Sequence, residues 1–258
     1  MLSTLFISHG SPMLALEPSP ARDFLAGLGA TLPRPRAILV ASAHWETARP
    51  QVNAVVVNET IHDFYGFPPA LFAMRYPAPG DPALAQHVAD MLRAAGFETS
   101  LDPMRGLDHG AWVPLALMYP AHDIPVLQLS IQTPLGPQHH LLLGRALDAL
   151  RRNDVLVIGS GSFTHNLGRL RRVEPGAAPS ADVVAFADWM HAALHDNRID
   201  DLLAYRSKAP YAAMQHPTDE HLLPLFVALG AAGDKAPATR LHASTTYGAL
   251  RMDAYAFG

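Results

Sequence analysis

The sequence predicts an α/β fold: a single three-layer α/β/α domain, residues 1–258, with a central sheet that is mostly parallel or mixed. Several short apolar runs are nearly continuous in Val, Ile and Leu, which is typical of strands covered on both faces. Helical patterns lie between these runs, as in layered α/β proteins. Hydrophobic residues make up 49% of the 258 residues, enough for one sizeable core, and no internal repeat or long linker divides the chain.

The expected strands are residues 4–8, 37–43, 52–57, 125–131 and 154–159. The first expected helix has Asp81 as its N-cap and Pro82 at its first position, and it ends at Gly96. Further helices are expected at residues 138–152, 180–196 and 218–229, the last with Thr218 as its N-cap. Residues 59–80 and 101–123 are expected to be long connections, and such connections are often functional.

Composition excludes several classes of function. Lys and Arg number 19 and Asp and Glu number 23, a net charge of −4, so there is no basic surplus for binding nucleic acid. The absence of cysteine excludes disulfides, thiolate catalysis and iron–sulfur centres. No run of residues is apolar enough to span a membrane, and no cationic segment precedes the first apolar stretch, so we expect a soluble cytoplasmic protein.

Histidines follow the apolar runs. His9 comes directly after residues 4–8, His44 after residues 37–43, and His165 shortly after residues 154–159. In open α/β sheets the ligand crevice lies outside the carboxyl ends of the strands. If these strands are parallel neighbours, the three imidazoles converge. Without cysteine, transition-metal chemistry must use imidazoles and carboxylates, so the pattern favours a shared metal site.

Two further histidines are candidates. His221 is expected in the first turn of the helix after Thr218, where the positive helix end keeps an imidazole neutral, as metal binding requires. His109 is flanked by Gly106 and Gly110, which let the backbone approach a ligand closely.

Other polar residues fit ordinary structural roles. A single histidine after a strand is usually a hydrogen-bonded turn residue, and only the number of such positions favours a site. His139 and His140 open an expected helix and are predicted at the surface. Ser160 and Ser162 lie in a Gly-Ser-Gly-Ser segment that lacks the spacing of a nucleophile elbow, so a serine nucleophile is not expected.

Several motifs, in order along nearly the whole chain, together resemble the DOPA extradiol dioxygenase family of the class III extradiol ring-cleaving dioxygenases. They occupy residues 6–13, 42–45, 61–68, 76–80, 107–110, 164–167, 217–221 and 247–252. The resemblance implies an enzyme that inserts O2 into a catechol-type aromatic diol, DOPA-like or related, and releases a ring-opened semialdehyde.

The resemblance also implies one divalent metal ion, Fe(II) for activity or Zn(II) as found in relatives. The positions that match family ligands are His9, His44 and His221, with His165 as a fourth ligand in zinc-loaded relatives. In protocatechuate-type relatives the third ligand is a glutamate, and the histidine resembling His165 is the catalytic base. The metal, and the role of His165 as ligand or base, therefore stay open.

Catechol cleavage needs a group that takes a phenolic proton and later returns one. Histidine suits both duties because its ordinary pKa is about 6.5. His109, which matches a family histidine close to substrate and oxygen, and His165 are the candidate catalytic residues. Trp45, Tyr65 and Trp112 are predicted to wall an aromatic pocket, with His62 as a further substrate contact.

Two alternatives stay open from the sequence. Three or four histidines can also hold zinc in a hydrolase, where the bound water has a pKa of about 7. A non-catalytic metal-binding interaction module on the same fold is the second alternative.

Overall fold

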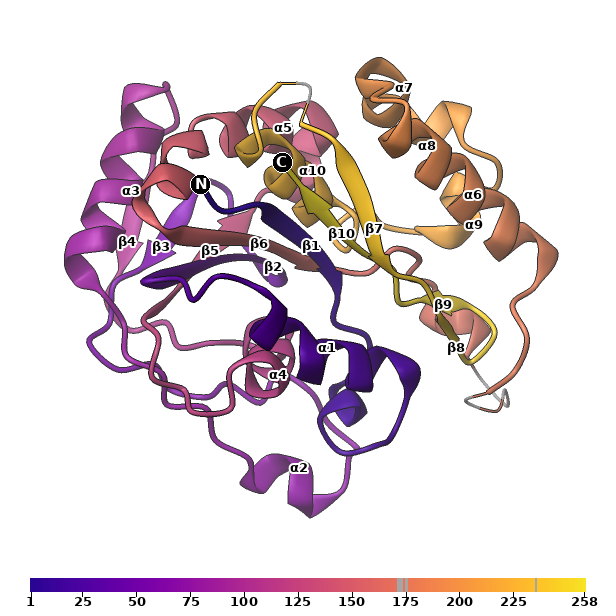
Figure 1. Cartoon of the computed structure of the whole chain (residues 1–258), viewed down its shortest axis with the longest axis horizontal. Coiled ribbons are helices and arrows are strands. Elements are labelled where there is room, and N and C mark those ends of the chain that lie inside the picture. The colour runs from indigo at the N-terminus through magenta and orange to yellow at the C-terminus, as the bar shows by residue number, and fades with distance from the viewer. Residues whose placement is uncertain (171–173, 175, 235) are drawn as a thin grey trace.

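The computed structural model describes residues 1–170, 174, 176–234 and 236–258. An eight-stranded sheet runs through its centre (Figure 1). The strands lie in the order β4 (Ser100–Asp102), β3 (Gln51–Asn53), β5 (Val126–Ile131), β2 (Ala37–Glu46), β6 (Val155–Gly161), β1 (Thr4–Ser8), β10 (Ala254–Phe257) and β7 (Ala238–His242). The four central strands β5, β2, β6 and β1 are parallel, and antiparallel pairs flank them. The expected mixed, mostly parallel sheet is confirmed.

Alternate residues of the central strands enter different cores. In β2, Ile38 and Val40 face the core that includes α1 (Pro20–Thr31) and α4 (His109–Met118). Leu39 faces the opposite core, with α3 (Pro82–Ala94), α5 (Gly136–Arg145) and α10 (Leu223–Ala231). Both faces of the sheet are therefore apolar and covered, which is why these strands read as continuous apolar runs. Figure 1 shows the resulting three layers.

The remaining elements lie mainly around this framework. A further core packs α6 (Ala181–His195) against the β10 side of the sheet. The shorter helices are α2 (Pro69–Ala73), α7 (Ile199–Leu203), α8 (Tyr205–Lys208) and α9 (Ala212–Gln215), and 3-10 turns cover Pro12–Ala15, Thr133–Leu135, Asp148–Asn153 and Leu167–Arg169. The strands β8 (Thr245–Thr246) and β9 (Leu250–Arg251) form a separate hairpin. None of the helices in the described part of the chain combines the length and the hydropathy of a membrane-spanning segment.

The helix after Asp81 forms as predicted. The Asp81 carboxylate accepts a hydrogen bond from Leu84 N at 2.9 Å, and Gly96 follows the helix with a φ of +91°. The predicted helix at 180–196 is also confirmed as α6. The extent predicted for the helix at 138–152 was wrong, because α5 ends at Arg145 and a separate 3-10 turn follows.

Three other expectations were wrong. The strand expected at 52–57 ends at Asn53, whose side chain donates to Asn58 Oδ1 at 2.8 Å while the chain turns away. The connection at 101–123 contains α4, which is apolar on nearly every side because it is buried, and so shows no helical periodicity. Thr218 is not an N-cap, since α10 begins at Leu223 and the preceding residues form irregular turns.

The strand register brings the carboxyl ends of β1, β2 and β6 to one edge. Ser160 of β6 pairs with Ile7 of β1 and with Ser42 of β2. The residues that follow β1, β2 and β6 are therefore neighbours in space.

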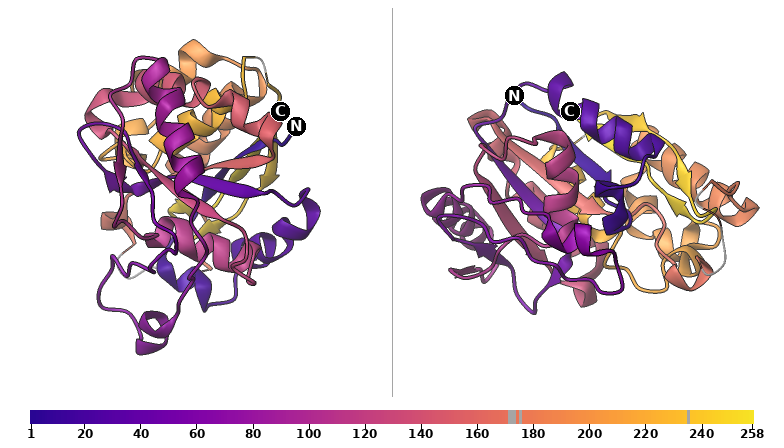
Figure 2. Two further views of the ribbon diagram at one scale, coloured as in Figure 1. Left: turned by 90° about the vertical axis from the view of Figure 1, so that its left-hand side faces the viewer. Right: turned by 90° about the horizontal axis from the view of Figure 1, so that it is seen from below.

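The two ends of the chain also meet, because β1 pairs with β10 along its length, and Figure 2 shows them side by side.

Candidate metal centre

His9 and His44 reach this edge from neighbouring parts of the sheet. His9 follows β1 directly, and its backbone N–H donates to Gly161 O at 3.0 Å. His44 lies within β2 rather than after it, because that strand continues to Glu46 beyond an irregular register. This corrects the expected strand end at residue 43 but leaves the imidazole at the same edge.

His221 arrives from the segment before α10. Its carbonyl accepts a hydrogen bond from Ser162 N at 2.8 Å, which fastens this segment to the end of β6. A Cβ at Gly161 would lie 2.0 Å from the His221 carbonyl oxygen, so only glycine permits this approach. The predicted position of His221 in the first turn of a helix was wrong. The segment that carries His221 precedes α10 and is held by its contacts with the end of β6.

The imidazoles of His9, His44 and His221 converge on one point. The Nε2 of His44 lies 3.0 Å from Nε2 of His9 and 3.3 Å from Nε2 of His221. A cation about 2.0–2.1 Å from each nitrogen would separate the nitrogens by about 2.9–3.4 Å. Three nitrogens cannot all be satisfied by hydrogen bonds to one another, whereas one cation satisfies all three. The donor set therefore fits a single metal ion.

These imidazoles are held neutral, as metal ligands must be. Burial, reinforced by the neighbouring imidazoles, keeps the pKa values of His9 and His221 well below the ordinary 6.5. Burial also lowers the pKa of His44 to about 3, with a contribution from His109, although the Asp63 carboxylate opposes it.

A hydrogen-bond chain fixes the tautomer of His9. Pro114 has no N–H, so the carbonyl of Gly110 lacks its usual donor within α4. The Ser160 hydroxyl donates to that carbonyl instead. Its oxygen then accepts from Nδ1 of His9 at 3.0 Å. His9 therefore carries its proton on Nδ1 and presents the Nε2 lone pair to the convergence point.

Carboxylates face Nδ1 of the other two converging imidazoles. Glu220 Oε1 accepts from Nδ1 of His221 at 2.9 Å, which again frees Nε2. Asp63 Oδ2 lies 3.6 Å from Nδ1 of His44. Such partners orient ligand imidazoles and raise their basicity.

His109 shares Asp63 with His44. Its Nδ1 lies 2.9 Å from Asp63 Oδ1, and its backbone N–H donates to the same oxygen at 3.0 Å. Burial opposes ionisation of Asp63, but the contacts with His109 outweigh it and lower the pKa of the carboxyl to about 2. The carboxylate oxygen beside Nδ1 of His109 favours the tautomer that carries its proton on that nitrogen.

The buried Asp108 positions both His44 and His109. It caps α4, which begins at His109, by accepting from Ala111 N at 3.3 Å. It also accepts hydrogen bonds from three side chains: Ser42 Oγ at 2.7 Å, Arg105 Nη2 at 3.0 Å and Gln128 Nε2. Because Ser42 precedes His44 by two residues, this carboxylate ties the end of β2 to the start of α4.

His165 stands beside the three converging imidazoles. Its ring stacks on His221, with centroids 3.4 Å apart and an interplanar angle of 12°. Its Nδ1 lies 3.9 Å from Glu220 Oε1. Among the described residues it groups with Glu220 and His221, not with His9 and His44.

A cavity of about 640 Å³ opens over the centre. His44, His109, His165 and His221 lie in its wall. Its apolar lining includes Phe64, Tyr65, Phe67, Leu167 and Leu250. The cavity thus joins an apolar, aromatic surface to the edge where the imidazoles converge.

Of the four expected substrate contacts, Tyr65 lines this cavity and is 92% exposed. The structure places the other three elsewhere. Trp112 is fully buried and its Nε1 donates to Ile61 O at 3.0 Å, while Nε2 of His62 lies 3.2 Å from the Met74 carbonyl. Trp45 packs under Arg105, whose guanidinium carbon is 5.0 Å from the ring centroid.

Comparison with known proteins identifies the family of this fold and site. Residues 3–258 match the family described as the catalytic LigB subunit of aromatic ring-opening dioxygenase. The chain belongs to this family. It is accordingly an enzyme of the extradiol ring-opening dioxygenase class, and the resemblance inferred from its motifs is confirmed.

Relatives match over nearly the full length. A protein named 4,5-DOPA dioxygenase extradiol from Beta vulgaris is 46% identical, covering 98% of this chain and 96% of the relative. A protein of the same name from Escherichia coli K12 is 38% identical, covering 97% and 93%. The crystal structure of an uncharacterized Escherichia coli K12 protein superposes with a TM-score of 0.81 at 34% identity, covering both chains fully.

Sequence reasoning missed three residues that touch the site histidines. Ser160 was weighed only as a nucleophile, and Asp63 only as part of a motif. Glu220, the hydrogen-bond partner of His221, likewise stood only within the motif at residues 217–221. The position of Ser160 near the end of an apolar run was the one signal in the sequence that it lies near the site. Its pairing with Ser42 and its hydrogen bond with His9 become visible only in the structure.

Proposed function

We propose that this protein is a metal-dependent extradiol dioxygenase that opens the ring of a catechol carrying a DOPA-like side chain, giving a semialdehyde. The convergence of Nε2 of His9, His44 and His221 at an aromatic-lined cavity carries the proposal. Family membership favours this function over the zinc hydrolase and the interaction module. The DOPA dioxygenase names of the relatives support the substrate class.

His9, His44 and His221 would hold one divalent ion. When bound, Fe(II) would supply the electron exchange between an aromatic diol and O2, a role closed to Zn(II), which has no redox chemistry. We therefore assign activity to the iron form, while the same imidazoles also accept zinc.

The remaining histidines would move protons. His109, with Asp63 Oδ1 2.9 Å from its Nδ1, lies in the cavity wall and would take a phenolic proton from the diol. His165 stacks on His221, has a carboxylate oxygen 3.9 Å from its Nδ1, and falls outside the group formed by His9, His44 and His221. This arrangement supports a base or proton donor rather than a fourth ligand. Phe64 and Phe67 would pack against the substrate ring.

Alanine variants separate these roles. His44→Ala should lose Fe(II) and Zn(II) binding in anaerobic calorimetry, because one of three ligands is gone. His109→Ala should keep the metal and lose oxygen uptake with catechols by at least 100-fold, the usual contribution of a general base. His195→Ala, at a surface histidine whose side chain is 70% exposed, is the control and should change neither.

Two outcomes would contradict the proposal. Full metal content in His44→Ala would refute the ligand set. Equal oxygen uptake by the zinc and iron forms would refute the assignment of activity to iron.

A further inference from the structure

We propose that a second pocket beside the catalytic cavity binds the aliphatic side chain of the catechol, and that Glu17 within it receives a cationic group such as an ammonium. The inference rests on the proposed function and adds the determinant of side-chain specificity.

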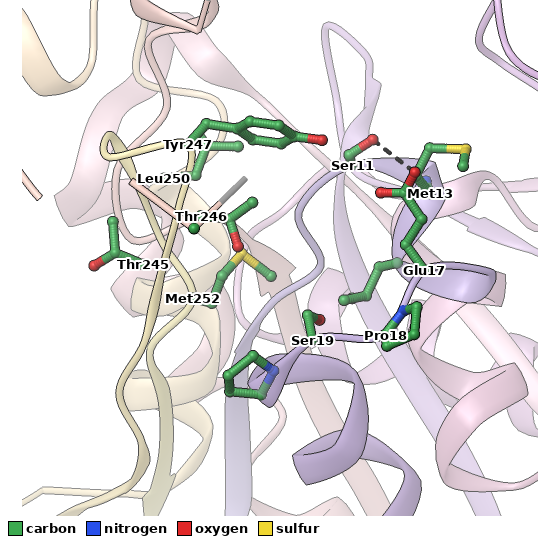
Figure 3. A pocket seen from close by; sticks show the side chains of 13 residues that line it. Ser11, Met13, Glu17, Pro18, Ser19, Thr245, Thr246, Tyr247, Leu250 and Met252 are labelled. Carbon is green, nitrogen blue, oxygen red and sulfur yellow. Dashed lines mark hydrogen bonds between the residues drawn. The ribbon is translucent and has the colours of Figure 1, made fainter. Parts of the chain in front are cut away.

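The second pocket has a volume of about 350 Å³ (Figure 3). It lies between the 3-10 turn Pro12–Ala15 with the following loop, on one side, and the β8–β9 hairpin on the other. This volume accommodates a short substituted alkyl chain together with a few water molecules, each of which occupies about 30 Å³.

The pocket and the catalytic cavity share part of their walls. Ser11, Tyr247 and Leu250 line both. Ser11 is two residues beyond His9. Between them Gly10, with a φ of +61°, turns the chain at the end of β1. The two cavities are therefore adjacent, and a substituent on a ring bound in the catalytic cavity would lie next to the second pocket.

Tyr247 is held at this boundary by an unusual backbone. Its φ is +53°, rare for a bulky residue, in a turn closed by a hydrogen bond from Ala249 N to Thr246 O at 3.3 Å. Figure 3 shows the ring with its hydroxyl directed toward Ser11. Burial and the nearby Glu17 carboxylate both raise the pKa of Tyr247, so Glu17 acts on the same space. Strained positions of this kind cluster at ligand sites.

The chemistry of the lining favours a positive group. Among the lining residues that the structure describes, Glu17 carries the only formal charge. The same lining also contains serine, threonine and tyrosine hydroxyls, and its apolar surface, which suits methylene groups, comes from Met13, Leu14 and Met252. An ammonium would find a carboxylate partner here, whereas a side chain ending in a carboxylate would be repelled.

Three catechols test this reading: 4-methylcatechol, dopamine and 3-(3,4-dihydroxyphenyl)propionate. They share the diol and differ in the charge of the side chain. In the iron-loaded protein, kcat/KM should be highest for dopamine. In Glu17→Gln the ratio of kcat/KM for dopamine to that for 4-methylcatechol should fall about threefold to fivefold, as expected for a partly exposed ion pair. The propionate should gain relative to dopamine.

Anaerobic calorimetry with the same three compounds gives a readout that is independent of turnover. Asp23→Asn is the matched control, since Asp23 is an exposed acid on α1 outside the pocket, and it should leave the ratios unchanged. An unchanged dopamine preference in Glu17→Gln, or an equal loss in Asp23→Asn, overturns this inference while leaving the dioxygenase proposal standing. If no catechol is cleaved by any form, the proposed function fails, and the anaerobic binding ratios still decide the side-chain pocket.

Discussion

Removal of the Ser160 hydroxyl tests how the protein prepares His9 for metal binding. In Ser160→Ala, Nδ1 of His9 loses its acceptor at 3.0 Å, and the Gly110 carbonyl loses its side-chain donor. The imidazole remains in place but is free to adopt the other tautomer. In that tautomer Nε2 carries the proton and cannot bind a cation.

The size of the effect follows from these two lost contacts. Loss of an outer hydrogen-bond partner typically lowers metal affinity about 10- to 100-fold. The unpaired buried carbonyl should lower the free energy of unfolding of the metal-free protein by about 1–3 kcal/mol. The variant should therefore fold and retain the ligand set, but bind metal weakly.

Ser162→Ala is a matched control. Ser162 is a buried serine two residues farther along, and its hydroxyl donates to Thr164 O at 2.7 Å rather than to a ligand. Zn(II) affinity is measured by competition with a chelator, and stability by urea unfolding. The reasoning is refuted if Ser160→Ala binds zinc within twofold of the parent, or if Ser162→Ala loses as much affinity.

Two further predictions concern stability. Asp108→Ala leaves three donor side chains around a buried site without their carboxylate, and should cost about 3–5 kcal/mol in urea unfolding. Asp81→Ala removes only a helix cap and should cost about 1 kcal/mol; equal losses would show that the buried network adds nothing. Burial lowers the pKa of His140 from 6.5 to about 4, so the folded state keeps it neutral while the unfolded chain takes up a proton. The free energy of unfolding should therefore fall as the pH drops below about 6.5, by about 1 kcal/mol per pH unit from this residue, and His140→Gln should show a shallower decline between pH 6 and 5.

The sequence predicted the central strands and the gathering of histidines because both leave local signals. Buried parallel strands are continuous apolar runs, and His9, His44 and His165 stand at or near their carboxyl ends. Parallel pairing of β1, β2 and β6 then brings these positions together. The prediction needed only the type of each strand, and did not depend on the exact ends that were wrong for β2.

Features set by distant contacts could not be predicted. The helix α4 is apolar on all sides, and the proline inside it hides it further. His140, expected at the surface, is buried, and both of its ring nitrogens are paired there: Nδ1 lies 2.7 Å from Gly136 O and Nε2 accepts from Gln132 N, contacts within one segment that residue types alone do not reveal. Trp112 was assigned to a substrate pocket by its residue type alone. The same ring suits a core, and nothing local distinguishes the two.

The position of β1 inside the sheet has a consequence for biosynthesis. β1 lies between β6 and β10, so both sheet partners of the strand that precedes His9 come from segments translated much later. A ribosome-bound nascent chain that has not yet exposed residues 221–257 lacks both a third imidazole and the last partner of β1. If His9, His44 and His221 hold the metal ion, as proposed, the complete set of three nitrogens exists only after residue 221 has been made.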